Sequence, residues 1–171
     1  MMSRFARGLD GLLQWILIVL MVALTAVVVV AVVYRRLGDS LSWYDEVSSI
    51  LLAWVTYYGA ALAALRRGHI GFDGVIYALP LPWRMWAVAL GEVLVVGFFA
   101  LMAWAGLEVL MVLEGTTLVS LTWVPVQFTQ SVIPVGAALF IVAELASLPF
   151  YWRAVRDGVP VDHDALEAGR S

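Results

Sequence analysis

Residues 11–34 read GLLQWILIVLMVALTAVVVVAVVY, a run of 24 residues without one charged side chain. About 20 apolar residues in a helix suffice to cross the hydrocarbon core of a bilayer. The many valines favour a strand, but a segment surrounded by lipid must satisfy its own backbone hydrogen bonds, as a helix does. The run is too long for the core of a secretory signal and has no small-residue cleavage site, so we expect a retained membrane helix.

The composition of the whole chain also indicates a protein that is surrounded by lipid. Of its 171 residues, 63% are apolar and 13% are charged, whereas soluble domains are about half apolar and about a quarter charged. A chain this short cannot bury so many apolar side chains in a water-soluble core. The composition therefore excludes a soluble enzyme, and the formal charge of -3 also argues against a nucleic-acid partner.

Three further apolar stretches have the length of membrane spans, at residues 47–65, about 86–113 and about 126–150. With the first stretch they predict an all-α integral membrane protein, in which residues 1–152 form one four-helix domain. Residues 153–171 read as a polar cytoplasmic tail.

Two local features modify this plan. Pro134 lacks a backbone donor, so we expect the fourth helix to be kinked or loosened near it. Residues 69–80 are too apolar for a solvated loop and too short to span, which predicts a short amphipathic interfacial segment between the second and third helices.

The arginines orient the four spans. All ten basic residues are arginine, and an inside N-terminus places eight of them inside, with only Arg35 and Arg36 outside. Because basic residues favour the cytoplasmic side, both termini are expected there. The chain is thus predicted to be a multi-pass membrane protein with both termini in the cytoplasm.

Charged side chains inside the spans are the first candidates for chemistry, because a charge in the bilayer is costly. Glu92, Glu108 and Glu144 lie inside the third and fourth spans. Glu92 and Glu108 are 16 residues apart, about 24 Å along a helix, so they cannot form one pair. An ion or proton relay is one interpretation. We favour near-interface or subunit-contact carboxylates, with Arg84 or Arg153 within reach of Glu144.

The ends of the second span carry most of the remaining polar residues. Asp45 and Glu46 stand at its start, where carboxylates stabilise the positive end of a helix dipole. Its other end leads into a cluster made of Arg66, Arg67, His69 and Asp73. This cluster either complements the helix end and anchors to lipid phosphates, or it binds a partner subunit or a lipid headgroup, and both interpretations stay open.

No catalytic motif accompanies these residues. The chain has no cysteine, only two histidines, no phosphate loop and no nucleophile with a nearby base. We therefore expect no catalytic residue, no metal site, no cofactor and no enzymatic activity.

The second span and its flanks resemble a known family. The residues that carry the resemblance are Trp43, Glu46, Trp54, Gly59, Ala63, Arg66, Arg67, His69 and Asp73. Their order is similar to that in the small membrane subunit of tripartite ATP-independent periplasmic (TRAP) transporters. The later Trp123-Val124-Pro125 and the sequence around Pro134 resemble the entry to that family's fourth span.

The resemblance implies a role in the uptake of organic acids, driven by an ion gradient. In such transporters a periplasmic solute-binding protein delivers substrate, and a large membrane subunit carries it across like an elevator. The small subunit extends the static scaffold and contributes no substrate ligand. The nine residues named above are then candidates for contact with the large subunit or with lipid.

Small residues supply the packing that such a scaffold needs, because close helix approach drives association in lipid. We expect the second and third helices to contact the large subunit through Gly59, Ala60, Ala63 and Ala64 and through Gly97, Ala100, Ala103 and Trp104. The outer loops are expected to touch the docked binding protein through Arg35, Arg36, Asp39 and Glu114.

Two alternatives use the same residues differently. A small homo-oligomeric transporter would couple protons through Glu92 or Glu144. A membrane adaptor or assembly factor would bind a partner that is not a carrier.

Overall fold

The structure, a computed structural model, describes residues 4–66 and 80–157. These residues contain four helices that are long and apolar enough to cross a membrane. The first three are α1 (Arg4–Arg36), α2 (Tyr44–Leu65) and α4 (Leu81–Val112), and α5 (Val126–Gln130) and α6 (Val132–Asp157) together make the fourth. The predicted all-α, four-span fold is confirmed.

The predicted interfacial segment between the second and third spans lies outside the described residues. Arg67, His69 and Asp73 also lie outside the described residues. Helix α6 continues to Asp157, so the described part of the expected tail, from Arg153 onward, is helical. Charged ends of this kind suit a membrane helix, since arginine favours helix and its long side chain reaches toward water.

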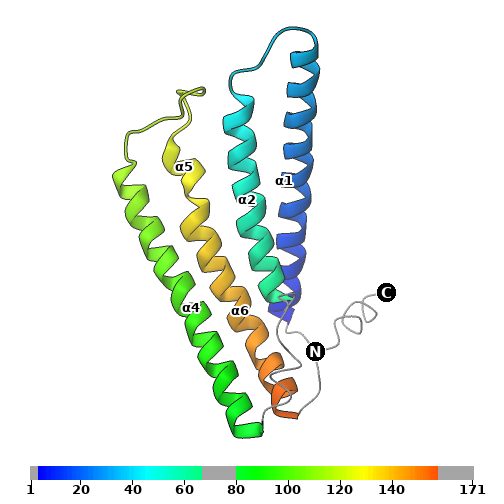
Figure 1. Cartoon of the computed structure of the whole chain (residues 1–171), viewed down its shortest axis with the longest axis vertical. Helices are drawn as coiled ribbons and strands as arrows, with labels where there is room; N and C mark the ends of the chain where they lie inside the picture. Colours follow the sequence, from blue (N-terminus) through cyan, green and yellow to red (C-terminus); the bar gives the residue numbers. More distant parts are fainter. Residues whose placement is uncertain (1–3, 67–79, 158–171) are drawn as a thin grey trace.

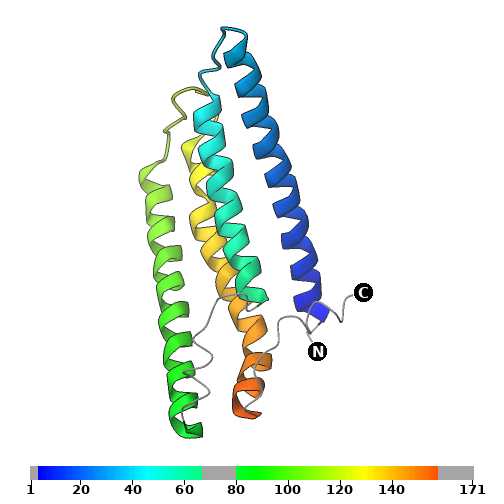
Figure 2. The same ribbon diagram turned by 45° about the vertical axis from the view of Figure 1, so that its right-hand side comes forward.

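The helices form a row rather than a closed bundle. Helix α2 packs against α1 on one side and α6 on the other, and α6 also packs against α4. Figure 1 shows the resulting order α4, α6, α2, α1 across the view, and Figure 2 shows the same order after a turn of 45°. Helices α1 and α4 therefore form the two edges, each with one packed side.

Chain direction alternates between the packed neighbours, except that α2 and α6 run parallel (Figure 1). The first residue of α1 and the last residue of α6 consequently lie at the same end of the row. We call this the Arg66 end, because α2 also finishes there, with Arg66 as its C-cap residue. The opposite end, which holds the α4–α5 loop (residues 113–125), is the loop end.

The core lies where α1, α2 and α6 meet, nearer to the Arg66 end. Its buried residues are Ala6, Leu13, Ala61, Ala64, Leu65, Phe140 and Ala143. More than half of them are alanines, which allow the three helices to approach closely without a water-driven hydrophobic effect.

Two glycines allow the closest approaches to α6. A Cβ atom on Gly136 would lie 2.7 Å from the Cβ of Tyr57 on α2, and one on Gly106 of α4 would lie 2.9 Å from the Cδ of Pro134. No real side chain tolerates such distances, so both positions require glycine in this packing. Helix α6 is thereby fixed against both of its neighbours.

The fourth span is interrupted at Ser131, between α5 and α6. Pro134 has no amide hydrogen, so it cannot donate to the carbonyl of Gln130 four residues earlier. The helix is therefore loosened in the turn that precedes Pro134, where the sequence predicts it.

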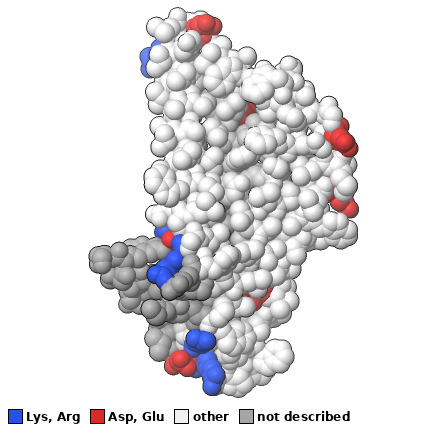
Figure 3. Space-filling model, turned by 180° about the vertical axis from the view of Figure 1, so that it is seen from behind, with Lys and Arg blue, Asp and Glu red and all other residues white. Residues whose placement is uncertain are grey.

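Charged groups are sparse over the middle of the molecule. Figure 3, which shows the row from behind, is white over most of its area, and its charged side chains gather toward the two ends and along one edge. An uncharged belt between charged ends is the surface that a bilayer requires.

Candidate functional site

The predicted contact residues of the second span lie on and around α2. Trp43 is half-buried and occupies the N-cap position of α2, with no side-chain hydrogen bond to the cap. Asp45 and Glu46 stand in the first turn, as expected from the helix dipole.

Glu46 also reaches a loop that is 73 residues further along the chain. Its Oε1 accepts a hydrogen bond from the backbone N–H of Val119 at 3.1 Å, and its Oε2 accepts one from the N–H of Ser120 at 2.9 Å. The hydroxyl of Ser120 donates to the same Oε2. Hydrogen bonds to a carboxylate are stronger than neutral ones, so α2 holds the α4–α5 loop through this one side chain.

Trp54 holds the next segment, α5. Its indole Nε1 donates to the carbonyl of Thr129 at 3.1 Å, and its ring centroid lies 5.3 Å from that of Phe128. Gln127 adds a bond from its Nε2 to the carbonyl of Leu110 on α4, at 2.8 Å. The short helix before the interruption is thus tied to both α2 and α4.

Gly59 and Ala63 lie on a different side of α2. Both are half-buried, and the spacing of three or four residues places them on the same helical face as the exposed Leu52 and Thr56. The nearest atom to a Cβ on Gly59 would be Cδ2 of Leu17 on α1, at 3.9 Å, which is ordinary contact distance. This face is therefore only partly covered by α1.

Arg66 forms an ion pair with Asp10 of α1. Asp10 is not among the residues predicted from the sequence. The Arg66 Nε lies 2.7 Å from Oδ1 and donates a hydrogen bond to it, and Nη2 donates to Oδ2 at 3.3 Å. The Asp10 side chain is 7% exposed and that of Arg66 is 33% exposed. Asp10 stands directly before the first apolar run, which marks it as a charge at a membrane boundary, but its partner 56 residues away has no local signal.

The register of α4 against α6 locates the three predicted relay carboxylates. Nη1 of Arg84 donates to the carbonyl of Val155 at 3.2 Å, and the rings of Phe99 and Phe140 stack with centroids 3.6 Å apart. In this antiparallel register Glu92 falls at the level of Ser147.

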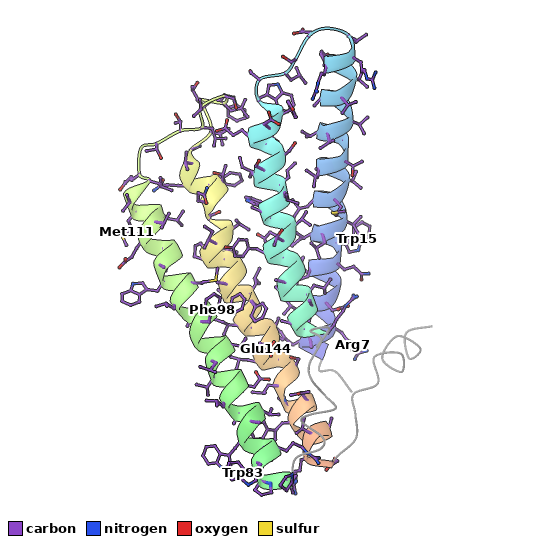
Figure 4. The ribbon with its side chains drawn as sticks, in the orientation of Figure 1. Arg7, Trp15, Trp83, Phe98, Met111 and Glu144 are labelled. Carbon is purple, nitrogen blue, oxygen red and sulfur yellow. The ribbon has the colours of Figure 1, made fainter. Side chains whose placement is uncertain are left out.

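Glu144 lies one turn from Ser147 on α6, and Figure 4 labels it in the lower half of the row. Glu144 is buried, and the Oε2 atom of Glu92 is buried as well. Ser147 links this region to α2, because its hydroxyl donates to the carbonyl of Ala64 at 3.3 Å. Two predicted relay residues therefore come to neighbouring levels on packed helices.

Glu108 does not join them. It is exposed on α4, 16 residues from Glu92, which corresponds to about 24 Å along the helix. The three carboxylates thus do not line a continuous path. Within residues 4–66 and 80–157, no group of three or more His, Cys, Asp or Glu side chains has the arrangement of a metal site.

Helix α4 leaves a broad apolar face uncovered at its edge of the row. Its exposed large side chains include Trp86, Leu90, Val93, Phe98, Leu101 and Trp104. Gly97 and Ala100, from the predicted small-residue face, are exposed between them, and a Cβ on Gly97 would meet no atom within 4 Å. This face has room for the close approach of another helix.

Comparison with known proteins relates the chain to a family and to a curated protein. The sequence model of the family described as "Tripartite ATP-independent periplasmic transporters, DctQ component" matches residues 24–153. The chain is also similar to the C4-dicarboxylate TRAP transporter small permease protein DctQ of Rhodobacter capsulatus, with 26% identity over 141 residues. That alignment covers 77% of this chain, and the chain spans 62% of the length of this curated relative.

Proposed function

Because the chain belongs to the family of DctQ components of TRAP transporters, we propose that it works as a fixed scaffold beside a large membrane subunit. The family is one of transporter subunits and not an enzyme class. In this proposal a periplasmic solute-binding protein delivers an organic acid, the large subunit moves it with the help of an ion gradient, and this chain binds no substrate.

The observation that carries the proposal is the uncovered stripe of α4. Val93, Gly97, Ala100 and Trp104 follow one another at helical spacing on a face that no described helix covers. Small residues between large apolar ones let a neighbouring helix approach closely. The edge of the row is thus suited to continue into a second set of membrane helices.

The ties within the row support a static role. Glu46, Trp54 and Arg66 of α2 each hold a different segment, and two glycines fix α6 against its neighbours. An elevator can move its cargo only relative to a part that stays at constant depth. Exposed tryptophans such as Trp83, near the Arg66 end of α4 (Figure 4), suit the membrane interface and would anchor that depth.

The proposed orientation places the Arg66 end in the cytoplasm of a bacterial inner membrane. Arg7, Arg66 and Arg84 lie toward that end, whereas Arg35 and Arg36 lie at the other. Basic residues favour the cytoplasmic side of a bilayer.

The second span supplies the remaining contacts in the proposal. Gly59 and Ala63 form its packing face, and the inner rim is pinned to the large subunit or a bridging lipid by Arg66, Arg67, His69 and Asp73. Charge-assisted hydrogen bonds would hold such a rim. Trp43 stands at the other end of α2, where an interfacial tryptophan fixes helix depth.

The test is co-purification of the tagged chain from native membranes in mild detergent. We expect a large polytopic protein at a roughly equal amount. Gly97→Leu with Ala100→Leu should lower its yield about fivefold or more, because the two leucines keep a partner helix from approaching α4 closely. Gly59→Leu with Ala63→Leu should also weaken assembly.

Ala26→Leu, on the exposed side of α1, is the matched control and should leave the yield unchanged. Recovery of the chain only as a self-oligomer, repeated in several detergents, would contradict the proposal. Attention would then turn to proton coupling through Glu92 and Glu144.

A further inference from the structure

Helix α4 carries a regular seam on its uncovered side, at the edge of the row (Figure 1). Its positions follow one another at intervals of four and three residues, and all of them are exposed: Leu90, Leu94, Gly97, Leu101, Trp104, Glu108 and Met111. We call these residues the α4 seam. A repeat of 3.5 residues keeps one stripe of a helix in contact with a partner helix that crosses it at a shallow angle of about 20°.

The α4 seam is apolar except at Glu108. We propose that this seam packs against one membrane helix of the large subunit, and that Glu108 fixes the register by pairing with an arginine or lysine on that helix. The inference rests on the proposed function, which places the large subunit at α4, and it adds a particular packing geometry and a particular polar contact.

Glu108 lies within the apolar surface of α4 and not beyond its end. Trp104 is 64% exposed on one side of it, and Met111 and Val112 are 67% and 82% exposed on the other. Within residues 4–66 and 80–157, Glu108 makes no hydrogen bond and no ion pair. A charged carboxylate is costly in such surroundings when lipid covers them, so a cationic partner would stabilise it.

The described part of this chain brings no cation to that position. No lysine or arginine occurs from residue 85 to residue 152, a range that includes α5 and most of α4 and α6. Arg84 precedes Glu108 by 24 residues, which is about 36 Å along the helix. The other described arginines lie toward the Arg66 end or at the far end of α1, on the opposite edge of the row.

Charge complementarity favours a helix of a membrane protein as the occupant of the seam. Anionic lipid headgroups carry the same charge as Glu108 and would repel it. A guanidinium or ammonium group on a facing helix would instead form charge-assisted hydrogen bonds with the carboxylate. Gly97 leaves space for that helix, since a Cβ atom there would meet no atom within 4 Å.

A single polar position in an apolar seam is suited to the control of register. Apolar side chains can pack again after a shift of one turn, whereas such a shift separates an ion pair and leaves two charges without partners. In helix seams one polar side chain specifies which residues face each other. Glu108 therefore sets the depth at which the large subunit packs on α4.

The experiment measures how much large subunit co-purifies with the tagged chain in mild detergent, without the binding protein. Glu108→Lys should lower that yield about tenfold, because two like charges would then meet inside the contact. Glu114→Lys is the matched control, because Glu114 is exposed beyond the end of α4, and it should leave the yield unchanged. Thermal unfolding of the isolated Glu108→Lys chain should equal that of the unmodified chain, which separates assembly from folding.

Charge reversal identifies the partner residue. Each arginine and lysine in the membrane helices of the large subunit is changed to glutamate in turn, and one such variant should restore the yield with Glu108→Lys. The chain has no cysteine, so Glu108→Cys should form a disulfide cross-link only with a cysteine placed at that partner position. Leu90→Cys lies on the same seam, about 27 Å away along α4, and should not form this cross-link.

The outcomes separate the two proposals. Failure of the unmodified chain to retain a large subunit counts against the proposed function. An unchanged yield for Glu108→Lys, or a lost yield that no charge reversal restores, overturns the register contact and leaves the scaffold role intact. Equal rates of maleimide labelling of Glu108→Cys in the isolated chain and in the complex would show that no helix covers this position, and would also overturn the contact.

Discussion

Helices α2 and α4 are both apolar spans, yet the molecule uses them in opposite ways. Helix α2 stands inside the row, buries Ala61, Ala64 and Leu65, and has side-chain ties to α1, the α4–α5 loop and α5. Helix α4 is ten residues longer, but it stands at the edge, buries only Val88 and Gly106, and leaves one broad apolar face uncovered. Hydropathy assigns both to the membrane, while position in the row decides which one organises the fold.

We predict that replacing glycine with leucine destabilises the fold inside the row and leaves folding unaffected on the uncovered face of α4. Gly136→Leu should lower the free energy of unfolding by about 3 kcal/mol or prevent folding, because the added side chain overlaps Tyr57. Gly97→Leu adds the same atoms to open space on α4 and should leave stability unchanged. Thermal unfolding in detergent micelles measures both, and similar losses for the two variants would refute the distinction.

The tie between α1 and α2 should have the next largest effect. Asp10→Asn leaves the partly buried Arg66 without its charged partner, and because Arg66 is one-third exposed we expect a loss of about 1–2 kcal/mol. Asp39→Asn, at an exposed loop position, is the control and should change little.

A double-mutant cycle with Arg66→Ala isolates the pair from the other effects of each substitution. A coupling free energy near zero would show that the two side chains do not stabilise the packing of α1 on α2.

The tie between α2 and α5 should be weaker. Trp54→Phe keeps an aromatic ring against Phe128 but removes the hydrogen bond to the Thr129 carbonyl, so we expect a loss of about 1 kcal/mol. Trp104→Phe, on the exposed face of α4, is the matched control and should have no effect on the isolated chain. Equal effects of the two substitutions would speak against a special role for the α2 indole.

The smallest effect on stability is expected from replacing Glu108, the exposed carboxylate of α4. Glu108→Gln should change the stability of the chain by less than about 0.5 kcal/mol, because surface substitutions away from specific contacts usually do. Uptake by the assembled transporter should also be unchanged. Abolished uptake with normal assembly would revive Glu108 as part of an ion relay.

Residues of α2 illustrate how far the sequence reaches toward the candidate site. The resemblance singles out Glu46 and Trp54, and both prove to hold segments that follow 73 and 75 residues later. The segments that these two side chains hold could not be predicted. From the local sequence, stabilisation of the helix dipole explains Glu46 equally well. Asp10 and Gly106 were missed for the same reason: a lone aspartate at a membrane boundary and a lone glycine in a span carry no sign of their partners.

The sequence by itself determined the solvent, the number of spans and the position of the proline break. These are local properties, because a bilayer selects segments by length and hydropathy and a proline removes a particular hydrogen bond. Only the tertiary structure decided that the spans form a row, that α2 lies inside it and that α4 keeps an open face. Neighbour order depends on which small residues meet across helices, and such contacts join residues that are far apart in the chain.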